Sequence, residues 1–188
     1  MNRQININRI TAGGVLIAFA IIIPQLFHLT GVPQSGQVFL PMHIPVLLSG
    51  FVLGPAFGMF VGILSPIISS AMTGMPAMER LPFMVAELVA YGVVGGLMYN
   101  TWKLKQKKLG IYLSLAVTMI AGRVVYALAL VIAANLFQIK CGGPIAAVTA
   151  TVTGIVGIVI QLVIIPPMIY LLEKSGYLDR YFRPCVQQ

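Results

Sequence analysis

A run of 38 residues, from Phe39 to Pro76, contains no Asp, Glu, Lys or Arg, and His43 is its one ionisable side chain. As a single helix from Pro41 to Thr73 it would be about 50 Å long, well beyond the ~30 Å hydrocarbon core of a bilayer. The chain must therefore turn. Gly54-Pro55 is the predicted place, because glycine commonly ends a helix and proline commonly begins one. The run thus predicts two short membrane helices.

Each of these two helices carries two glycines four residues apart, Gly50 and Gly54 on the first and Gly58 and Gly62 on the second. Small residues at this spacing let helix backbones approach closely in lipid, so we expect the two helices to pack on each other. The run also holds residues that usually line something polar when they occur inside a membrane span: His43, Pro45, Pro66, Ser69 and Ser70.

The rest of the chain is equally apolar. Hydrophobic residues make up 59% of the 188 residues and charged residues 9%, with a mean hydropathy of +0.95. These values exclude a disordered chain and argue against a soluble fold. At about 20 residues per span, the length allows about six spans and leaves no room for a soluble catalytic module. We predict an all-α integral membrane protein with a single membrane domain, with spans at about 10–29, 41–53, 56–73, 81–101, 110–137 and 145–172.

The basic residues are unevenly distributed between the predicted loops. With the N-terminus inside, nine of the twelve Lys and Arg residues fall on the cytoplasmic side, Arg80 and Lys140 fall in outer loops, and Arg123 lies within a span. Because basic residues favour the cytoplasmic side, both termini are predicted to be cytoplasmic. Membrane orientation also accounts for the net charge of +8 without nucleic acid as a partner. Cys141 and Cys185 fall on opposite sides in this topology, so no disulfide is expected between them.

Arg123 and Glu87 are the charged residues inside the predicted spans. Arg123 lies near the middle of the fifth span, where an arginine costs about 2.5–3.5 kcal/mol on insertion scales and therefore needs a partner. Glu87 lies about two turns inside the outer end of the fourth span. Either the two residues neutralise each other, or Arg123 faces a cavity and meets an anionic or carbonyl group of a ligand. The second reading gains weight if Glu87 lies too near the outer surface to compensate Arg123 fully.

Other residues in the spans have the polar or aromatic side chains that small-molecule pockets use: His43, Tyr91, Tyr126, Asn135 and Gln161. A lone histidine near the outer end of a span is either structural or a ligand contact. Tyr126 is three residues beyond Arg123 and lies on a similar helix face, whereas Asn135 can simply mark the membrane interface. We expect an outward-facing cavity among spans four to six, with Arg123 at its floor and the loops after spans one, three and five as its roof.

The first span carries a pair of small residues, Gly14 and Ala18, near its cytoplasmic side, and Ala12, Gly13 and Ala20 widen this smooth face. Such a face either packs within the same protein or docks to a second membrane protein.

Several catalytic motifs do not occur in the sequence. It has no P-loop, no HExxH and no GxSxG motif, and no pair of acidic residues placed to bind a catalytic metal. An enzyme is therefore disfavoured, no cofactor or metal is expected, and a transport or binding role is favoured.

Six short helices, a small-residue motif in the first, a glutamate in the fourth and the stretch LPMHIPVLLSGFVLGP…GMFVGILSPIISSAMTGMP resemble the substrate-binding S components of energy-coupling factor (ECF) transporters. The resemblance covers nearly the whole chain. It implies a multi-pass cell-membrane subunit that binds a water-soluble vitamin or related micronutrient from outside, and that associates with a transmembrane coupling protein and two ATPases. The family's first-helix motif is usually Ala-x-x-x-Ala, from which Gly14-x-x-x-Ala18 is a conservative departure.

The resemblance and Arg123 together favour a small carboxylated vitamin of the niacin type. Riboflavin, pantothenate, folate and cobalamin stay open, because members of this family share a scaffold and differ in the pocket. Two other classes remain as alternatives. A self-sufficient channel or secondary transporter would favour inverted repeats and a polar path through both leaflets. An intramembrane enzyme would need a nucleophile and a base, which the sequence does not supply.

Overall fold

The computed structural model describes residues 7–29, 35–101, 110–136 and 143–176. Within these ranges the chain forms helices and no strand, which confirms the predicted all-α class. Six segments of the described chain are long and apolar enough to cross a membrane, as predicted: Ile7–Phe27, Gly36–Leu53, Pro55–Thr73, Leu81–Asn100, Gly110–Asn135 and Ile155–Lys174.

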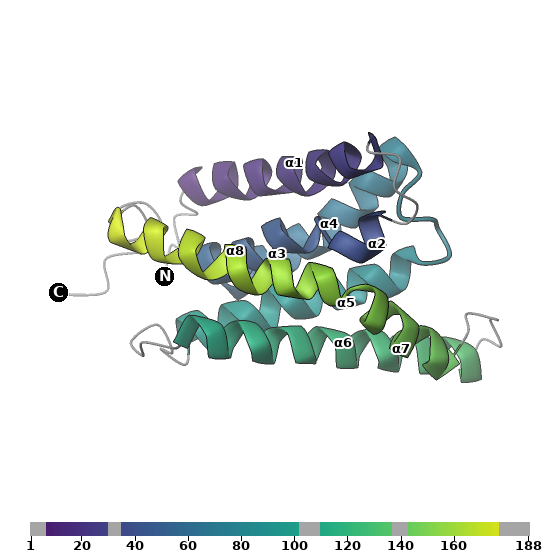
Figure 1. Ribbon diagram of the computed structural model, residues 1–188. Coiled ribbons are helices and arrows are strands. Elements are labelled where there is room, and N and C mark those ends of the chain that lie inside the picture. Colours follow the sequence, from purple (N-terminus) through teal and green to yellow (C-terminus); the bar gives the residue numbers. More distant parts are fainter. Residues whose placement is uncertain (1–6, 30–34, 102–109, 137–142, 177–188) are drawn as a thin grey trace, which may run out of the picture.

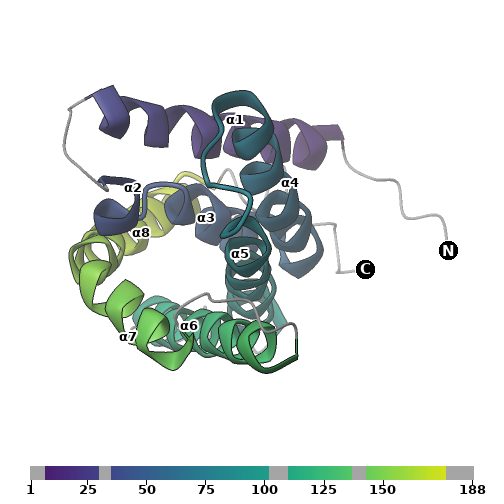
Figure 2. The same ribbon diagram turned by 90° about the vertical axis from the view of Figure 1, so that its right-hand side faces the viewer.

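The helices are α1 (Ile7–Leu29), α2 (Ser35–Phe39), α3 (His43–Leu53), α4 (Pro55–Thr73), α5 (Leu81–Gly96), the π-helical turn η1 (Leu97–Thr101), α6 (Gly110–Leu136), α7 (Gly143–Thr153) and α8 (Ile155–Lys174). Helix α5 packs against α3, α4 and α6, and α1 lies on the outer side of α3 and α4 (Figures 1 and 2). Helix α1 begins and α8 ends at the same end of the bundle, which we call the terminal end (Figure 1). Helices α2 and α7 and the α4–α5 loop lie at the other end, the loop end.

The predicted turn at Gly54-Pro55 is confirmed. Gly54 has φ +97°, a conformation that glycine adopts without the Cβ clash of other residues, and its N–H donates to the Gly50 carbonyl at 3.1 Å. Pro55 is the first residue of α4, where its missing N–H costs no helical hydrogen bond.

The close approach of the glycines differs from the prediction, because the partner is α5 rather than the facing helix of the pair. A Cβ added at Gly50 or at Gly58 would lie 2.5 Å from the carbonyl oxygen of Gly92, and one at Gly62 would lie 2.7 Å from that of Leu88. Three helices therefore meet backbone to backbone at Gly92, which explains why small residues are needed on all three.

Ser69 and Ser70, which were singled out as residues that usually line something polar, bond to the backbone of the following loop. The Ser69 hydroxyl donates to the Met75 carbonyl at 2.7 Å, and the Ser70 hydroxyl donates to the Pro76 carbonyl at 2.8 Å. Helix α4 ends at Thr73, and Gly74 caps it with φ +71°. The two serines therefore hold the start of the α4–α5 loop against the last turns of α4.

The sixth span also differs from its prediction as one helix over 145–172. It is divided into α7 and α8, with Gly154 between them. A continuous helix of this length would measure about 42 Å, longer than the ~30 Å hydrocarbon core. The second span is likewise preceded by the short helix α2 and a turn at Leu40, whose φ of +49° is unusual for a side chain with a Cβ.

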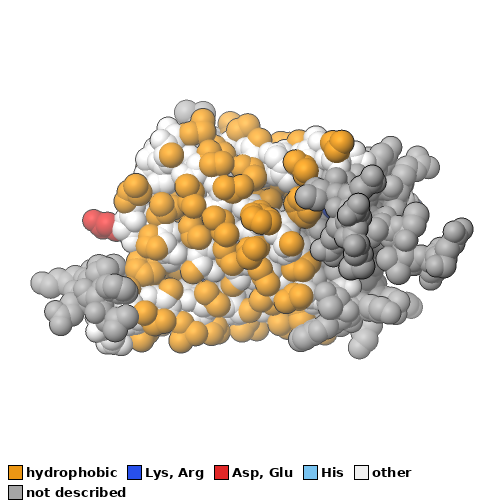
Figure 3. Space-filling view, turned by 180° about the vertical axis from the view of Figure 1, so that it is seen from behind, with side chains coloured by type: hydrophobic (Ala, Val, Ile, Leu, Met, Phe, Trp, Pro, Cys, Tyr) orange, Lys and Arg blue, Asp and Glu red, His pale blue; other side chains and the backbone are white. Residues whose placement is uncertain are grey.

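The surface between the two ends of the bundle is apolar. On the face seen in Figure 3 the described side chains are almost all hydrophobic or uncharged. Large hydrophobic side chains such as Phe19 on α1, Leu128 on α6 and Val163 on α8 are half exposed or more. This is the surface that a protein embedded in lipid presents.

Candidate functional site

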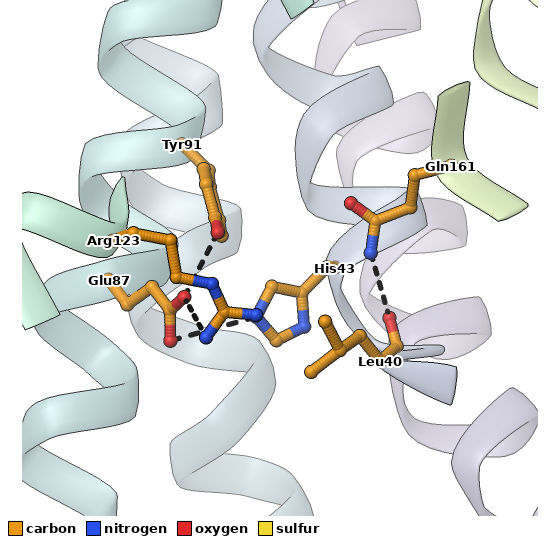
Figure 4. A network of polar contacts seen from close by, with 6 residues as sticks. All are labelled: Leu40, His43, Glu87, Tyr91, Arg123 and Gln161. Atoms are coloured by element: carbon orange, nitrogen blue, oxygen red, sulfur yellow. Dashed lines mark hydrogen bonds and ion pairs between the residues drawn. The ribbon is translucent and has the colours of Figure 1, made fainter. Parts of the chain in front are cut away.

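Four of the predicted site residues come together in one place, which we call the polar cluster: His43, Glu87, Tyr91 and Arg123 (Figure 4). His43 is the first residue of α3, and Arg123 is the middle residue of α6. Glu87 and Tyr91 are four residues apart on α5 and so lie on one face of that helix. Three helices thus bring together residues that are far apart in the sequence.

Glu87 is the common partner within the polar cluster. The Arg123 Nη1 atom lies 3.2 Å from Glu87 Oε1, and the Tyr91 hydroxyl donates to the same oxygen at 3.0 Å. The His43 Nε2 atom lies 3.8 Å from Glu87 Oε2, an ion-pair distance beyond hydrogen-bond length. The expectation that Glu87 lies too near the outer surface for Arg123 is therefore wrong, and mutual neutralisation of the two residues holds in this geometry.

Several nitrogens of the polar cluster nevertheless have no hydrogen-bond partner. Nε and Nη2 of Arg123 and Nδ1 of His43 are buried without one, and His43 Nε2 has only its 3.8 Å ion-pair contact with Glu87. The His43 side chain is 2% exposed and that of Arg123 is 14% exposed. A buried polar group left without a partner costs about 1–3 kcal/mol. The arrangement therefore suits a ligand that brings acceptor atoms.

Two glycines that the sequence analysis did not identify leave space for these side chains. A Cβ at Gly122 would overlap the ring of Tyr91, so this glycine lets the tyrosine ring contact α6 closely. A Cβ at Gly154 would lie 2.9 Å from Arg123 Nη2 and 3.0 Å from Leu40 Cδ1. For Gly154 the one available signal was the length of the sixth span, because a single helix of that length is longer than a membrane crossing needs.

Gln161 lies at the edge of the site. It is fully buried on α8, and its Nε2 donates to the Leu40 carbonyl at 3.5 Å (Figure 4). The backbone N–H of His43 donates to the same carbonyl at 3.1 Å. Gln161 therefore supports the turn that positions His43 and does not itself belong to the polar cluster.

Tyr126 and Asn135 are not brought to the polar cluster. Tyr126 packs against a separate apolar group of Phe83, Leu130 and Ala133. Asn135 is exposed near the end of α6, twelve residues and so about 18 Å along the helix from Arg123.

A hollow of about 250 Å³ adjoins Arg123 between α6 and α7. Ala127, Val148, Thr151 and Val152 form the rest of its lining, so its walls are mainly apolar. Its walls come from α6 and α7, whereas the cavity was expected among spans four to six, and Val148 and Val152 are largely exposed. Of the loops expected to roof that cavity, residues 30–34 after span one and 137–142 after span five lie outside the described residues, as do Cys141 and Cys185.

Among the described residues, no group of three or more His, Cys, Asp or Glu side chains is placed to hold a metal ion. The polar cluster contributes one carboxylate and one imidazole, and its remaining charged group is a guanidinium. The polar cluster can therefore bind a ligand group that is anionic or that carries hydrogen-bond acceptors.

Comparison with known proteins identifies the family. The family model described as ECF transporter, substrate-specific component, matches residues 8–169, which is most of the chain. None of the curated proteins and none of the solved structures compared with the chain matches it. Proteins of this family are integral membrane proteins that bind a small substrate for transport with the ECF module, and they are not enzymes. The chain therefore belongs to the substrate-specific components of ECF transporters.

Proposed function

We propose that this chain captures a small water-soluble vitamin that carries a carboxylate, and that Arg123 binds this carboxylate. The observation that carries the proposal is that only some nitrogens of the Arg123 guanidinium have a partner in the protein. Nη1 is paired with Glu87, whereas Nε and Nη2 are buried without a partner. A ligand carboxylate on these two atoms would form a charge-assisted contact, the kind for which the planar guanidinium is suited.

The niacin type is the favoured vitamin. The hollow beside Arg123 is open on one side and has a volume of about 250 Å³, below the ~300–1,000 Å³ of pockets for drug-sized ligands. This size, together with the apolar lining, supports a small ring with one charged group. Riboflavin, pantothenate, folate and cobalamin are the other vitamins that a binding assay should include.

The loop end of the bundle is proposed to face outside and the terminal end to face the cytoplasm. The polar cluster lies toward the loop end, since His43 begins α3 and Glu87 lies in the second turn of α5, which starts there. With this orientation nine of the twelve basic residues are cytoplasmic. A ligand from outside then reaches the polar cluster without crossing the whole bundle.

Helix α1 is proposed to dock to the transmembrane coupling protein of the ECF module, whose two ATPases supply the energy. Gly14 and Ala18 both lie on the exposed side of α1, and a Cβ at Gly14 would meet no atom within 4 Å. Gly13 and Ala20, which were expected on the same smooth face, are instead buried. The exposed small residues are thus available to a partner helix.

The test begins with the full-length protein purified in detergent. Mass spectrometry of small molecules that co-purify should find a carboxylated vitamin, and calorimetry should then show saturable binding of that compound. A protein that carries no vitamin and binds none of the five candidates would contradict the proposed function. Titration of nicotinate against nicotinamide separates the carboxylate from the ring, because the two compounds differ in that group alone.

A further inference from the structure

One residue beside the polar cluster has a backbone conformation that its side chain disfavours. Leu40 has φ +49°, whereas the other residues of the described chain with positive φ are glycines. A bulky residue is rarely found in this left-handed region, because its Cβ comes too close to the following carbonyl oxygen. Strained residues of this kind persist only where the surrounding structure holds them, and they cluster at ligand-binding sites.

Contacts on both sides of Leu40 hold it in place. Its carbonyl accepts a hydrogen bond from the His43 N–H at 3.1 Å and one from Gln161 Nε2 at 3.5 Å. On the preceding side, a Cβ added at Gly157 would lie 2.8 Å from the carbonyl carbon and oxygen of Phe39, so α2 ends in close backbone contact with α8. The turn is thus fixed against α3 and α8, and Leu40 itself is buried, with 8% of its surface exposed.

The Leu40 side chain borders the edge of the Arg123 guanidinium formed by Nε and Nη2, which we call the free edge. Leu40 Cδ1 lies 3.0 Å, and Arg123 Nη2 2.9 Å, from the same point, the Cβ position of Gly154. In Figure 4 the Leu40 side chain also lies beside the His43 imidazole. Both nitrogens of the free edge and Nδ1 of His43 are buried without a hydrogen-bond partner. An apolar side chain therefore adjoins the nitrogens that the protein leaves unpaired.

We infer that Leu40 determines the selectivity of the site for an anion, by keeping water away from the free edge of Arg123. This inference rests on the proposed function and deepens it, because it names the residue that makes a carboxylate necessary. Water that reached the free edge would pair with Nε and Nη2 in the ligand-free protein, and a carboxylate would then gain little by replacing it. Behind an apolar side chain the two donors stay unpaired until a ligand with acceptor atoms takes the place of Leu40 against them.

The same arrangement defines the class of ligand. A site with buried donors discriminates strongly against a ligand that lacks the matching acceptors, since the donors are then left without partners. A carboxylate has two oxygens for the two nitrogens of the free edge, while Glu87 continues to hold Nη1. An amide offers one oxygen and turns its NH2 donor toward the second nitrogen. The ligand is therefore a small carboxylic acid in its ionised form, and the corresponding amide or alcohol is rejected.

The experiment compares matched pairs of probes on the full chain in detergent. Nicotinate is paired with nicotinamide and pantothenate with pantothenol, so that each pair differs in the carboxylate. For the pair that binds, calorimetry of the wild-type protein should show a preference for the anion of about a hundred-fold or more.

Two variants remove the apolar cover. Leu40→Ala and Leu40→Gly let water reach the free edge, and each should lower the preference for the anion by about ten-fold or more. Leu40→Met, which nearly conserves the volume of leucine, should recover most of this loss. Leu40→Gly should also melt at a higher temperature than Leu40→Ala, because glycine adopts φ +49° without the Cβ clash. The glycine variant thus keeps the test open if the alanine variant does not fold, and the reverse order of melting temperatures would contradict the strained turn.

Leu53→Ala is the matched control. Leu53 is 4% exposed and packs against Leu16, Phe57 and Leu172 at the other end of α3 from His43. Truncation of this leucine should lower the melting temperature and leave the preference for the anion unchanged. An equal fall in preference in Leu53→Ala would show that general loosening of the bundle, and not the loss of Leu40, is responsible.

The outcomes separate the two proposals. If the wild-type protein prefers the anion and the folded Leu40 variants keep that preference, the role of Leu40 is wrong while carboxylate binding by Arg123 stands. Equal affinity for both members of a pair overturns the inference and the carboxylate contact but leaves vitamin binding intact. A wild-type protein with no bound vitamin and no affinity for any probe overturns the proposed function as well.

Discussion

Arg123 has two chemically different sides. A guanidinium carries five N–H donors, and in this protein Nη1 faces the carboxylate of Glu87 while the opposite edge is buried without acceptors. Glu87 in turn also accepts the Tyr91 hydroxyl. The ion pair therefore offsets the charge of the arginine inside the membrane without using its whole hydrogen-bonding capacity.

Arg123→Ala is expected to weaken binding of the carboxylated ligand by about 2–5 kcal/mol, the range for removing one partner of a buried charge pair. Arg123→Lys should also weaken it, because an ammonium cannot reproduce the fork of the guanidinium. Calorimetry on folded, monodisperse protein measures both. Near-native affinity in Arg123→Ala would reduce this residue to a structural ion pair and move the search to the other predicted residues.

Glu87→Gln is expected to lower the melting temperature of the ligand-free protein. Removing one partner of a buried ion pair costs about 3–5 kcal/mol, because the other charge is left uncompensated. The double variant Glu87→Gln/Arg123→Met should recover much of the loss, since neither charge remains. A carboxylate ligand should raise the melting temperature of Glu87→Gln more than that of the wild type. Additive effects of the two substitutions would show that the pair contributes nothing.

The scarcity of polar residues in the spans predicted the members of the polar cluster, but it could not predict how they pair. Glu87 and Arg123 are 36 positions apart, and helical periodicity says nothing about contacts between helices. Tyr126 shares a similar helix face with Arg123, yet it lies about one turn farther along and meets Phe83 instead. Composition therefore limits the candidates, whereas tertiary packing selects among them.

At the scale of the helices, the length of an apolar segment predicted the turn at Gly54-Pro55, and the same reasoning could have predicted the break at Gly154. The argument that placed a turn at Gly54-Pro55 also applies to the sixth span, where the structure has a break at Gly154. The difference lies in the local signal: the first site has proline after glycine, whereas the second has glycine alone. The turn at Leu40 carries no glycine: the Leu40 carbonyl accepts from the His43 N–H within the turn and from Gln161 on the distant helix α8.

Gly92→Ala is expected to disrupt the junction of α3, α4 and α5. Its added Cβ would overlap the backbone of Gly58, which cannot move without separating the helices. Overpacking of this kind costs about 1–3 kcal/mol or more. Gly95→Ala, on the next turn of α5, is the control, because its Cβ would lie 3.4 Å from a Thr118 side chain. Melting temperatures in detergent should fall clearly for Gly92→Ala and little for Gly95→Ala; equal values would show that the junction can relax.

At the scale of the whole molecule, the polar cluster and the exposed small residues of α1 lie on different parts of the bundle. The polar cluster is enclosed by α3, α5 and α6, whereas α1 lies outside α3 and α4 (Figure 2). Ligand binding and partner docking are therefore expected to be separable by mutation.

The chain has no P-loop, so concentrative uptake is expected to require separately encoded ATPases. Proteoliposomes that contain this chain alone, without an ion gradient, should bind the vitamin but not accumulate it. Addition of the coupling protein, the two ATPases and ATP should restore accumulation. Accumulation by the chain alone would favour the secondary-transporter alternative.

Gly14→Leu and Ala18→Leu are expected to abolish uptake by the assembled transporter while leaving the ligand affinity of the isolated chain unchanged. Both positions lie on the exposed side of α1, and a leucine there meets no atom of the described chain near the Gly14 Cβ position, so the fold tolerates it. A partner helix that approaches through small residues would instead be pushed away. Val15→Leu, at a neighbouring exposed position that already carries a large side chain, should leave uptake intact.

Calorimetry and vesicle uptake are measured on the same preparations. A fall in affinity equal to the fall in uptake would make this face part of the protein's own packing, because docking to a partner cannot alter binding by a chain that has no partner present.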